Sequence, residues 1–322
     1  RAAPHGPQRG PTMARGHHGT EEVNCNMDDS GLTQVPQLPP QLGKLSMQKN
    51  RIANLSSLGT SERTLHTLEV QKNRLINISC LQRCPGLLVL KVSHNYLEDK
   101  AFACLGSCTQ LRTLYATHNQ LQGVAVLAEA LGGTKVETLD LASNSLRDVA
   151  PLLELKTLRR LEAERNSVVT LVVRSPAPCL EHLGLARNRI STVKGLHHLP
   201  ALQELRLDLN PTLAEEGTLH VEHPFIKTVS LSGCGLRELQ EHAIRLPSAA
   251  ALDLTGNKLV APPVLSSCRS LTTLSLKANG IRSLQPLSCL TSLSFLDASQ
   301  NRVSQLESRL ANCLSSLTVL LL

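Results

Sequence analysis

Residues 179–200 read CLEHLGLARNRISTVKGLHHLP, and the pattern L-x-x-L-x-L-x-x-N-x-L within them decides the fold. The same register runs from Leu42 to the end of the chain. Successive repeats are 22 to 25 residues long, and Cys234 takes the Asn position in one of them. The other eleven positions are all Asn: Asn50, Asn73, Asn95, Asn119, Asn144, Asn166, Asn188, Asn210, Asn257, Asn279 and Asn301.

The L-x-L core of each repeat predicts a short strand. Two Leu side chains fall on one face of such a strand, and the residue between them falls on the other face. Neighbouring repeats then pair their strands in parallel and bury each other's Leu faces, which predicts a solenoid. The Asn follows the strand where the chain turns, and its amide can satisfy buried backbone groups there. Cys234 is a weaker donor at this position, so a looser turn is expected.

The amino-acid composition agrees with a single type of strand that is repeated along the chain. Of 322 residues, 63 are Leu, whereas only 5 are Phe or Tyr and none is Trp. The core must therefore be aliphatic and layered. A hydrophobic content of 41% excludes a disordered chain, and no apolar run is long enough to cross a membrane. The net charge of +7 is modest, and surface aromatics are scarce, so nucleic acid is not an expected partner.

The repeats resemble those of leucine-rich repeat proteins. CLEHLGLARNRISTVKGLHHLP (179–200) and SLTTLSLKANGIRSLQPLSCLT (270–291) are similar to the 22-residue subclass. That subclass is typified by the leucine-rich-repeat regulatory subunit of protein phosphatase one, and includes centrosomal and ciliary proteins. The resemblance implies an α/β solenoid with the form of a curved horseshoe. Its concave face would be a parallel β-sheet, and its convex segments would be short helices or irregular structure.

The two ends depart from the repeat. Residues 1–22 are rich in Gly, Pro, Arg and His, and are predicted to be a disordered tail. Residues 23–41 are predicted to form a degenerate capping turn, and residues 42–322 the solenoid, with twelve repeats and a truncated thirteenth. The start at Arg1, with the first Met at position 13, indicates either a fragment or translated upstream sequence before Met13. The stop within a strand at Leu322 predicts that the natural protein continues further.

The ten cysteines raise the question of a disulfide framework or a zinc site. Two C-x3-C pairs, at positions 80 and 84 and at positions 104 and 108, lie in adjacent repeats. However, Cys84, Cys108 and Cys268 fill a slot that Leu occupies elsewhere, which favours a packing role. Extracellular members of the resembled family usually carry a four-cysteine cap, where this chain has only Cys25. We therefore expect a cytoplasmic protein, including a centrosomal, ciliary or cytoskeletal one.

No enzyme motif is present in the sequence. It lacks a Gly-rich phosphate loop, G-x-S-x-G and H-E-x-x-H, and the pairs His17-His18 and His197-His198 have no further ligands nearby. We expect no catalysis, no cofactor, no metal, no membrane association and no small-molecule substrate.

The outward strand residues form the candidate partner site. In the predicted register, an acidic centre with nearby arginines is expected on the concave face, and Tyr115 is its only aromatic anchor. A solvated face without a partner is the alternative interpretation. The candidate residues are Tyr115, Asp140, Arg160, Glu162, Glu164, Arg206 and Asp208.

A second candidate surface lies immediately before each Asn. This column is basic over most of the first seven repeats, and it turns neutral after Arg187. Such a rim could steer an acidic partner toward the site. The residues of this basic rim are Lys49, Lys72, His94, His118, Arg165 and Arg187.

Together these features predict an interaction protein. The chain is expected to be a non-catalytic intracellular scaffold that binds another protein on its concave face. A phosphatase-regulatory role and a centrosomal or ciliary assembly role both follow from the resemblance. One alternative is the recognition array of a larger signalling enzyme whose catalytic domain lies beyond residue 322. Another is a secreted or cell-surface receptor ectodomain, which would need a signal peptide and a cysteine-rich cap.

Overall fold

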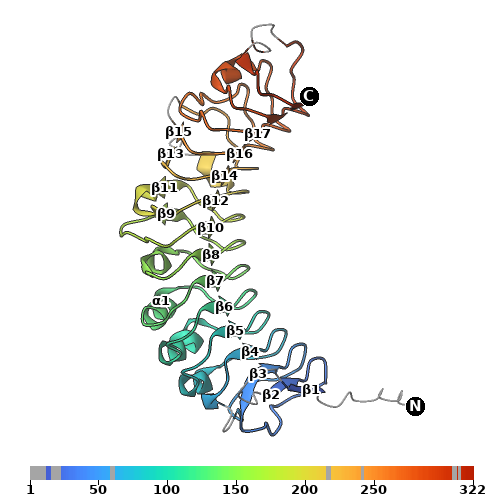
Figure 1. Ribbon diagram of the computed structural model, residues 1–322, viewed down its shortest axis with the longest axis vertical. Helices are drawn as coiled ribbons and strands as arrows, with labels where there is room; N and C mark the ends of the chain where they lie inside the picture. Colours follow the sequence, from blue (N-terminus) through green and yellow to red (C-terminus); the bar gives the residue numbers. More distant parts are fainter. Residues whose placement is uncertain are drawn as a thin grey trace, which may run out of the picture. The chain divides into compact units, whose positions relative to one another are not determined.

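The computed structural model describes residues 12–15, 23–58, 62–214, 219–240, 243–306, 310 and 313–322. The chain divides into two compact units, Arg1–Ser145 and Leu146–Leu322. Figure 1 labels helices and strands of each. Among the described residues, no helix combines the length and the apolar character needed to cross a membrane.

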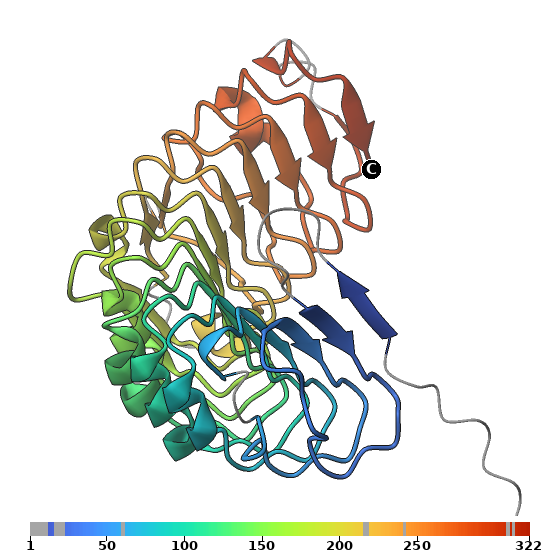
Figure 2. The same ribbon diagram turned by 60° about the horizontal axis from the view of Figure 1, so that its bottom comes forward.

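The first unit is built on a parallel sheet whose strands follow the order of the chain. Equivalent residues of successive repeats pair, as Leu68 does with Leu45 and with Leu90. One additional strand, β1 (Thr12–Arg15), pairs with β2 in the antiparallel direction (Figure 2). The parallel strands are β2 (Val23–Asn26), β3 (Leu42–Ser46), β4 (Thr67–Glu69), β5 (Val89–Lys91), β6 (Thr113–Tyr115) and β7 (Thr138–Asp140).

The second unit repeats this plan with a longer run of parallel strands. Its register again aligns the strand leucines, as Leu183 pairs with Leu161 and with Leu205. The strands are β8 (Arg160–Glu162), β10 (His182–Gly184), β12 (Glu204–Arg206), β14 (Thr228–Ser230), β16 (Ala251–Asp253), β17 (Thr273–Ser275), β18 (Phe295–Asp297) and β19 (Val319–Leu321).

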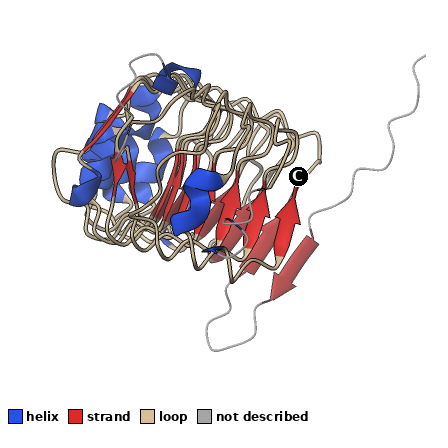
Figure 3. Cartoon of the chain, turned by 90° about the horizontal axis from the view of Figure 1, so that it is seen from above, coloured by secondary structure: helices blue, strands red, loops and turns tan. Residues whose placement is uncertain are grey.

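The segments that return the chain from one strand to the next are short helices, small sheets and irregular structure (Figure 3). In the first unit they include η2 (Ser79–Arg83), η3 (Asp99–Ser107) and α1 (Ala125–Leu131). In the second unit they include η4 (Ala150–Glu154), η5 (Leu196–His198), η6 (Pro211–Ala214) and η7 (Gln285–Cys289). Two small parallel sheets join β9 (Thr170–Val172) to β11 (Thr192–Lys194), and β13 (Val221–Glu222) to β15 (Ile244–Arg245).

Among the return segments, the α-helix lies in the longest repeat. The α-helix α1 lies in the 25-residue repeat between Asn119 and Asn144, the longest of the chain, and its sequence AVLAEAL consists of good helix formers. By contrast, β9 and β11 lie in 22-residue repeats and contain Val and Thr, which favour strands. These features confirm the predicted α/β architecture of a parallel sheet with short helical and irregular segments.

The core of each unit is a stack of aliphatic columns. Apart from those of the last strand, β19, the strand leucines are buried, for example Leu68 and Leu114 in the first unit and Leu205 and Leu274 in the second. Each fully buried Leu contributes roughly 1.5–3 kcal/mol of hydrophobic stabilisation. Because every repeat supplies the same set, the free energy of unfolding is distributed along the stack.

The Asn positions form a ladder of amides between the coils. Asn188 is typical, since its Nδ2 donates to the carbonyls of Ala163 and Leu185 at 3.0 and 2.9 Å, while its Oδ1 accepts from the Val168 amide at 3.0 Å. One side chain thus satisfies backbone groups in its own coil and in the preceding coil. At Cys234 the thiol keeps the bond to the Leu207 carbonyl, at 3.1 Å, but it has no amide oxygen that could accept a bond.

The residue before each Asn adopts a left-handed backbone conformation. In non-Gly residues this conformation costs roughly 1–2 kcal/mol, so it persists only where the surrounding hydrogen bonds enforce it. Gly233 and Gly256 fill two of the positions. The others, with φ between 53° and 58°, are Lys49, Lys72, His94, His118, Ser143, Arg165, Arg187, Leu209, Ala278 and Gln300.

The start of the chain differs in part from the prediction of a tail over residues 1–22. Residues 12–15 of that segment form β1, and the rest of it lies outside the described residues. The physical reason is that β2 would otherwise present an open edge, whose free amides and carbonyls can pair with any extended segment. Residues 23–41 contain β2, whose Cys25 is buried and pairs with Leu45.

Candidate functional site

The outward side chains of the parallel strands make up the surface that we call the sheet face. On β8, for example, Leu161 is buried in the core, whereas Arg160 and Glu162 on either side of it point outward. Strand alternation therefore places every second residue of each strand on the sheet face.

Arg160 and Glu162 form an ion pair along the edge of the second unit's sheet face. Arg160 Nη2 lies 2.6 Å from Glu162 Oε1. The Glu162 carboxylate also occupies the space above Gly184 on the next strand, where the Cβ of any other residue would collide with Glu162 Oε2. Gly184 is thus the residue that lets this carboxylate lie flat across the sheet.

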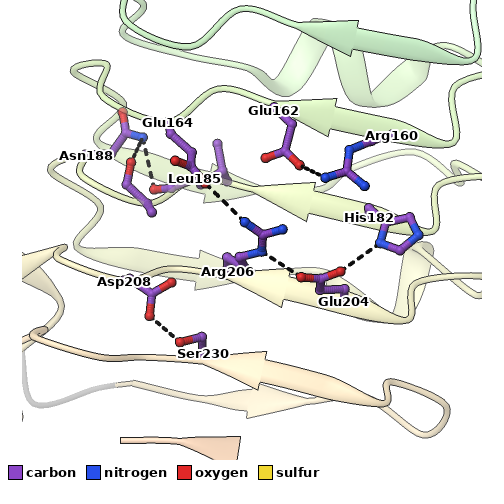
Figure 4. A network of polar contacts seen from close by, with 11 residues as sticks. Arg160, Glu162, Glu164, His182, Leu185, Asn188, Glu204, Arg206, Asp208 and Ser230 are labelled. Atoms are coloured by element: carbon purple, nitrogen blue, oxygen red, sulfur yellow. Dashed lines mark hydrogen bonds and ion pairs between the residues drawn. The ribbon is translucent and has the colours of Figure 1, made fainter. Parts of the chain in front are cut away.

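Arg206 is the centre of a larger network on the same face (Figure 4). Its Nε donates to Glu204 Oε1 at 2.6 Å, and its Nη1 lies 3.5 Å from Glu164 Oε1. The other oxygen of Glu204 lies 2.9 Å from Nδ1 of His182. Side chains from β10, from β12 and from the turn after β8 are therefore linked through one guanidinium group.

The network holds its carboxylate in the charged form. Burial alone would raise the pKa of Glu204, but hydrogen bonds from Arg206 and His182 outweigh burial and lower it. The hydrogen bond that Arg206 donates to Glu204 raises the pKa of Arg206. These side chains remain partly exposed, so the pairs add only about 0–1 kcal/mol each to stability. Their main effect is to fix a charge pattern on the surface.

Asp208 lies at the end of the same strand but turns toward the next coil. Its Oδ1 accepts hydrogen bonds from the Ser230 hydroxyl and, at 3.0 Å, from the Ser232 amide. The structure therefore gives Asp208 a role in joining two coils, beside the network rather than within it.

In the first unit the sheet face carries a different cluster around Glu69. This carboxylate is only 8% exposed and lies 2.8 Å from Lys91 Nζ and 3.2 Å from Lys44 Nζ. Burial favours a raised pKa, yet the two ammonium groups outweigh it and lower the pKa of Glu69. Lys91 Nζ also lies 5.9 Å from the ring centroid of Tyr115, the predicted aromatic anchor.

Asp140 also belongs to the first unit, at the end of β7. Its Oδ1 accepts a hydrogen bond from the Ala142 amide at 3.1 Å, within the turn that follows the strand. The structure thus groups Arg160, Glu162, Glu164 and Arg206 on the second unit, while Tyr115 and Asp140 lie on the first.

The residues of the basic rim share one place in the fold. All six occupy the left-handed position before the Asn, and all six are exposed. Four lie on the first unit and two on the second. Within the first unit, the rings of His94 and His118 stack, with their centroids 4.0 Å apart and a 17° angle between planes. Burial is the main cause that lowers the pKa of His94, and the charges of His118 and Lys72 lower it further.

The sequence-predicted set lacks five charged residues of these clusters, which are Lys44, Glu69, Lys91, His182 and Glu204. His182 and Glu204 immediately precede the first strand Leu, the position that Arg160 also occupies. This column is otherwise filled mainly by Thr and apolar residues, so its charged members could have been found by inspecting it in full. Lys44 stands in this same column, whereas the pairing of Glu69 with Lys44 and Lys91 depends on which neighbouring side chains reach each other.

Five of the ten cysteines are buried in the core, namely Cys25, Cys84, Cys108, Cys234 and Cys268. Cys84, Cys108 and Cys268 are fully buried. Burial, the largest cause, raises the pKa of Cys84 to about 12 and that of Cys108 to about 11. Since metals bind the thiolate, such environments disfavour coordination. In the part of the chain that the structure describes, no three or more His, Cys, Asp or Glu side chains gather in a way that could hold a metal ion.

One pocket of about 520 Å³ lies among the return segments of the second unit. Its lining includes Lys194, His197, His220 and Glu222. His220 Nε2 lies 3.1 Å from Glu222 Oε2, and Thr192 also lines the pocket.

Solved structures match nearly the whole chain. A leucine-rich repeat protein of Leptospira interrogans aligns with a TM-score of 0.64 and 22% identity, covering 91% of this chain and 82% of its own. This chain has the leucine-rich repeat fold. The leucine-rich repeat domain of APL1B aligns with a TM-score of 0.67 and 20% identity, covering 92% and 87% of the two chains. A chain of the LRIM1/APL1C complex aligns with a TM-score of 0.66 and 22% identity over 86% of this chain and 52% of its own.

No protein-family model and no curated protein matches the sequence. The likeness is therefore to a leucine-rich repeat architecture, at identities that define the fold alone. For this leucine-rich repeat chain, the function has to be argued from its own surface residues.

Proposed function

We propose that this chain is a non-catalytic scaffold that binds a partner protein across the sheet face of its second unit. The Arg206-centred network is the observation that carries the proposal. Leucine-rich repeat strands expose a rigid surface, and here Arg206, Glu164, Glu204 and His182 fix an alternating charge pattern on it. Fixed charges of both signs favour recognition of a complementary protein surface, and they restrict which partners fit.

A structural precedent supports a protein partner. One similar leucine-rich repeat chain comes from the LRIM1/APL1C complex. For this chain, the proposed centre of the interface is Arg160, Glu162, Glu164 and Arg206 on the second unit. Tyr115 and Asp140 are proposed as separate candidate contacts on the first unit. Asp208 supports the interface by joining two coils.

Charge reversal tests this proposal. The double variant Glu162→Lys/Glu164→Lys reverses two adjacent carboxylates of the sheet face. Its matched control is Glu129→Lys/Glu154→Lys, which makes the same change in net charge at exposed residues of α1 and η4. Proteins captured by the wild type and by the control, but lost by the sheet-face variant, support the proposal. Thermal melting shows whether each variant is folded.

Identical sets of captured proteins for the folded sheet-face variant and the control contradict the proposal. A milder variant, Arg206→Gln, removes the central guanidinium without reversing a charge and guards against misfolding. It should weaken the same interactions about 10- to 100-fold, if Arg206 acts as a central charged contact.

The finer roles are proposals that rest on the sequence resemblance. We infer either a phosphatase-regulatory role or a centrosomal or ciliary assembly role, in the cytoplasm. The ten unbridged cysteines support a reducing compartment. Direct binding to the catalytic subunit of protein phosphatase one, measured by calorimetry, tests the first role. Co-localisation of the full-length protein with a centrosomal marker tests the second. A catalytic domain encoded after residue 322 would instead support the alternative of a larger signalling enzyme.

A further inference from the structure

The first unit carries a strip of cations on the edge where its strands turn. In each coil, the residues just before and just after the ladder Asn flank this turn. We call the strip formed by Lys49, Arg51, Lys72, Arg74, His94, Tyr96 and His118 the basic turn edge. All seven side chains are exposed.

Backbone hydrogen bonds hold these positions in neighbouring rows. The Lys49 amide donates to Gln71 and the Lys72 amide to Ser93, while the Arg74 amide donates to Ile52. Coils of a parallel sheet lie about 4.8 Å apart, so four coils present a strip roughly 15–20 Å long. The 4.0 Å stacking of His94 on His118 shows that side chains in adjacent rows meet.

The cations of the basic turn edge differ from those of the sheet face in one respect. On the sheet face, Lys44 and Lys91 pair with Glu69. On the basic turn edge, none of the four Lys and Arg side chains forms an ion pair with any residue that the structure describes. One carboxylate, Asp29, lies at the start of the same column, one coil before Lys49, and it too is exposed. Four cations without an ion pair among the described residues of the first unit therefore lie together on this strip.

We propose that the basic turn edge binds an extended acidic polypeptide segment. The strip matches the length of about five extended residues. Its left-handed backbone points Lys49 and Lys72 outward from a rigid turn, so little ordering is needed on binding. Tyr96, which is 50% exposed, adds an amphipathic contact beside the cations. A single aromatic residue suits a peptide better than a nucleic acid, which is bound by several stacking rings.

This inference extends the proposed function, since the acidic segment would belong to a protein partner, but it concerns a different surface. It can therefore be tested without knowing that partner. The probe is a fluorescein-labelled octapeptide of alternating Glu and Asp, and fluorescence anisotropy measures its affinity for the full chain. An octapeptide of alternating Gln and Asn is the neutral control.

The variant Lys72→Gln/Arg74→Gln removes two cations from the middle of the strip. Affinity for the acidic peptide should fall about 5- to 20-fold, a loss typical of two exposed charge contacts. The matched control Arg63→Gln/Lys100→Gln removes one Arg and one Lys at exposed positions of the first unit away from this edge, and should bind as the wild type does. The Arg206→Gln variant, which removes a cation from the sheet face, should also retain the peptide.

Several outcomes overturn the proposal. One is equal affinity of the wild type for the acidic and the neutral peptide, and another is an equal loss of affinity in the control variant and the edge variant. Loss of the peptide in Arg206→Gln would place it on the sheet face. An oligothymidine that binds tighter than the peptide and depends on Lys72 and Arg74 would identify nucleic acid as the ligand. If the peptide binds as expected while the sheet-face variant keeps every captured protein, the proposed function fails and this inference stands.

Discussion

At the residue scale, the side chain at the ladder position decides how well each coil is joined to its neighbour. Asn188 makes bonds with backbone groups of two coils through both ends of its amide. Cys234 supplies a donor alone. The comparison shows that one position in the repeat can be weakened without loss of the sheet, because β14 and β16 still pair beside it.

Exchanging the two residue types at the ladder position predicts opposite changes in stability. Asn188→Cys should lower the free energy of unfolding by about 1–3 kcal/mol, because backbone groups lose their partners. Cys234→Asn should raise it by about 0.5–2 kcal/mol, because an amide oxygen becomes available. Urea denaturation of both variants checks the pair. Equal effects in the same direction would show that the ladder bonds do not set stability.

Another residue-scale prediction concerns the buried His223. Its Nε2 donates to the Leu199 carbonyl at 2.9 Å, and its Nδ1 accepts from the Ile226 amide at 2.9 Å, an arrangement that requires the neutral ring. Burial lowers the pKa of His223, although the carbonyl of Leu199 partly opposes this. Below about pH 6.5 the unfolded chain takes up a proton at this histidine that the folded protein does not. The free energy of unfolding therefore decreases as the pH is lowered below this value.

Thermal melting at pH 7.5 and pH 5.5 measures this loss. The wild type and the exposed-residue control His197→Asn should show the same decrease in Tm, whereas His223→Asn should show a smaller one. A decrease in His223→Asn as large as in the wild type would mean that other groups cause the pH dependence.

At the element scale, the strands and the buried columns were predictable, because each is repeated in the sequence many times. The return segments were less so. Helix α1 forms where the repeat is longest, and β9 and β11 form where β-branched residues coincide in adjacent coils. Strand β1 could not be predicted from its own composition, since it depends on the open edge of β2.

For the candidate site, the sequence predicts which residues point outward from the strands, but it does not predict which of their side chains contact each other. Outward positions such as Glu162 and Arg206 follow from strand alternation. The link from Arg206 through Glu204 to His182 depends on rotamers and on the reach between coils, which a repeat pattern does not contain. Asp208 shows the same limit, because it joins Ser230 rather than the network.

A prediction at this scale compares two leucines of adjacent repeats. Leu185 is fully buried beside β10, so Leu185→Ala should lower the free energy of unfolding by about 2–5 kcal/mol, because a cavity remains. Leu209, which is 41% exposed at a left-handed position, should cost less than about 0.5 kcal/mol for the same change. Chemical denaturation gives both values. A similar cost for the two variants would contradict the assignment of Leu185 to the core.

At the scale of the whole molecule, stability is distributed over coils that contact mainly their neighbours. The buried cysteines report on this, with Cys84 and Cys108 in the first unit and Cys234 and Cys268 in the second. Each thiol is protected by burial, and burial also raises the pKa of Cys234 to about 11. Cys289 is exposed and serves as the reference.

Thiol labelling in increasing urea should therefore resolve the units. Cys289 should react in the native protein, whereas the four buried thiols should react only when their coils open. We expect Cys84 and Cys108 to become reactive at one urea concentration, and Cys234 and Cys268 together at their own. Mass spectrometry of labelled peptides measures each site. Rapid native labelling of all five would contradict the described packing.

The left-handed position before each ladder residue has a consequence for how such a protein can diversify. The backbone there accepts Lys, His, Ser, Arg, Leu, Gly, Ala and Gln in this one chain, and none of these is β-branched. The side chain at this position is independent of the aliphatic layers, so its chemistry can change without any compensating change inside. A lineage could thus change the partner preference of this edge one coil at a time, with residues other than Pro, whose ring fixes a negative φ, and the β-branched Val, Ile and Thr.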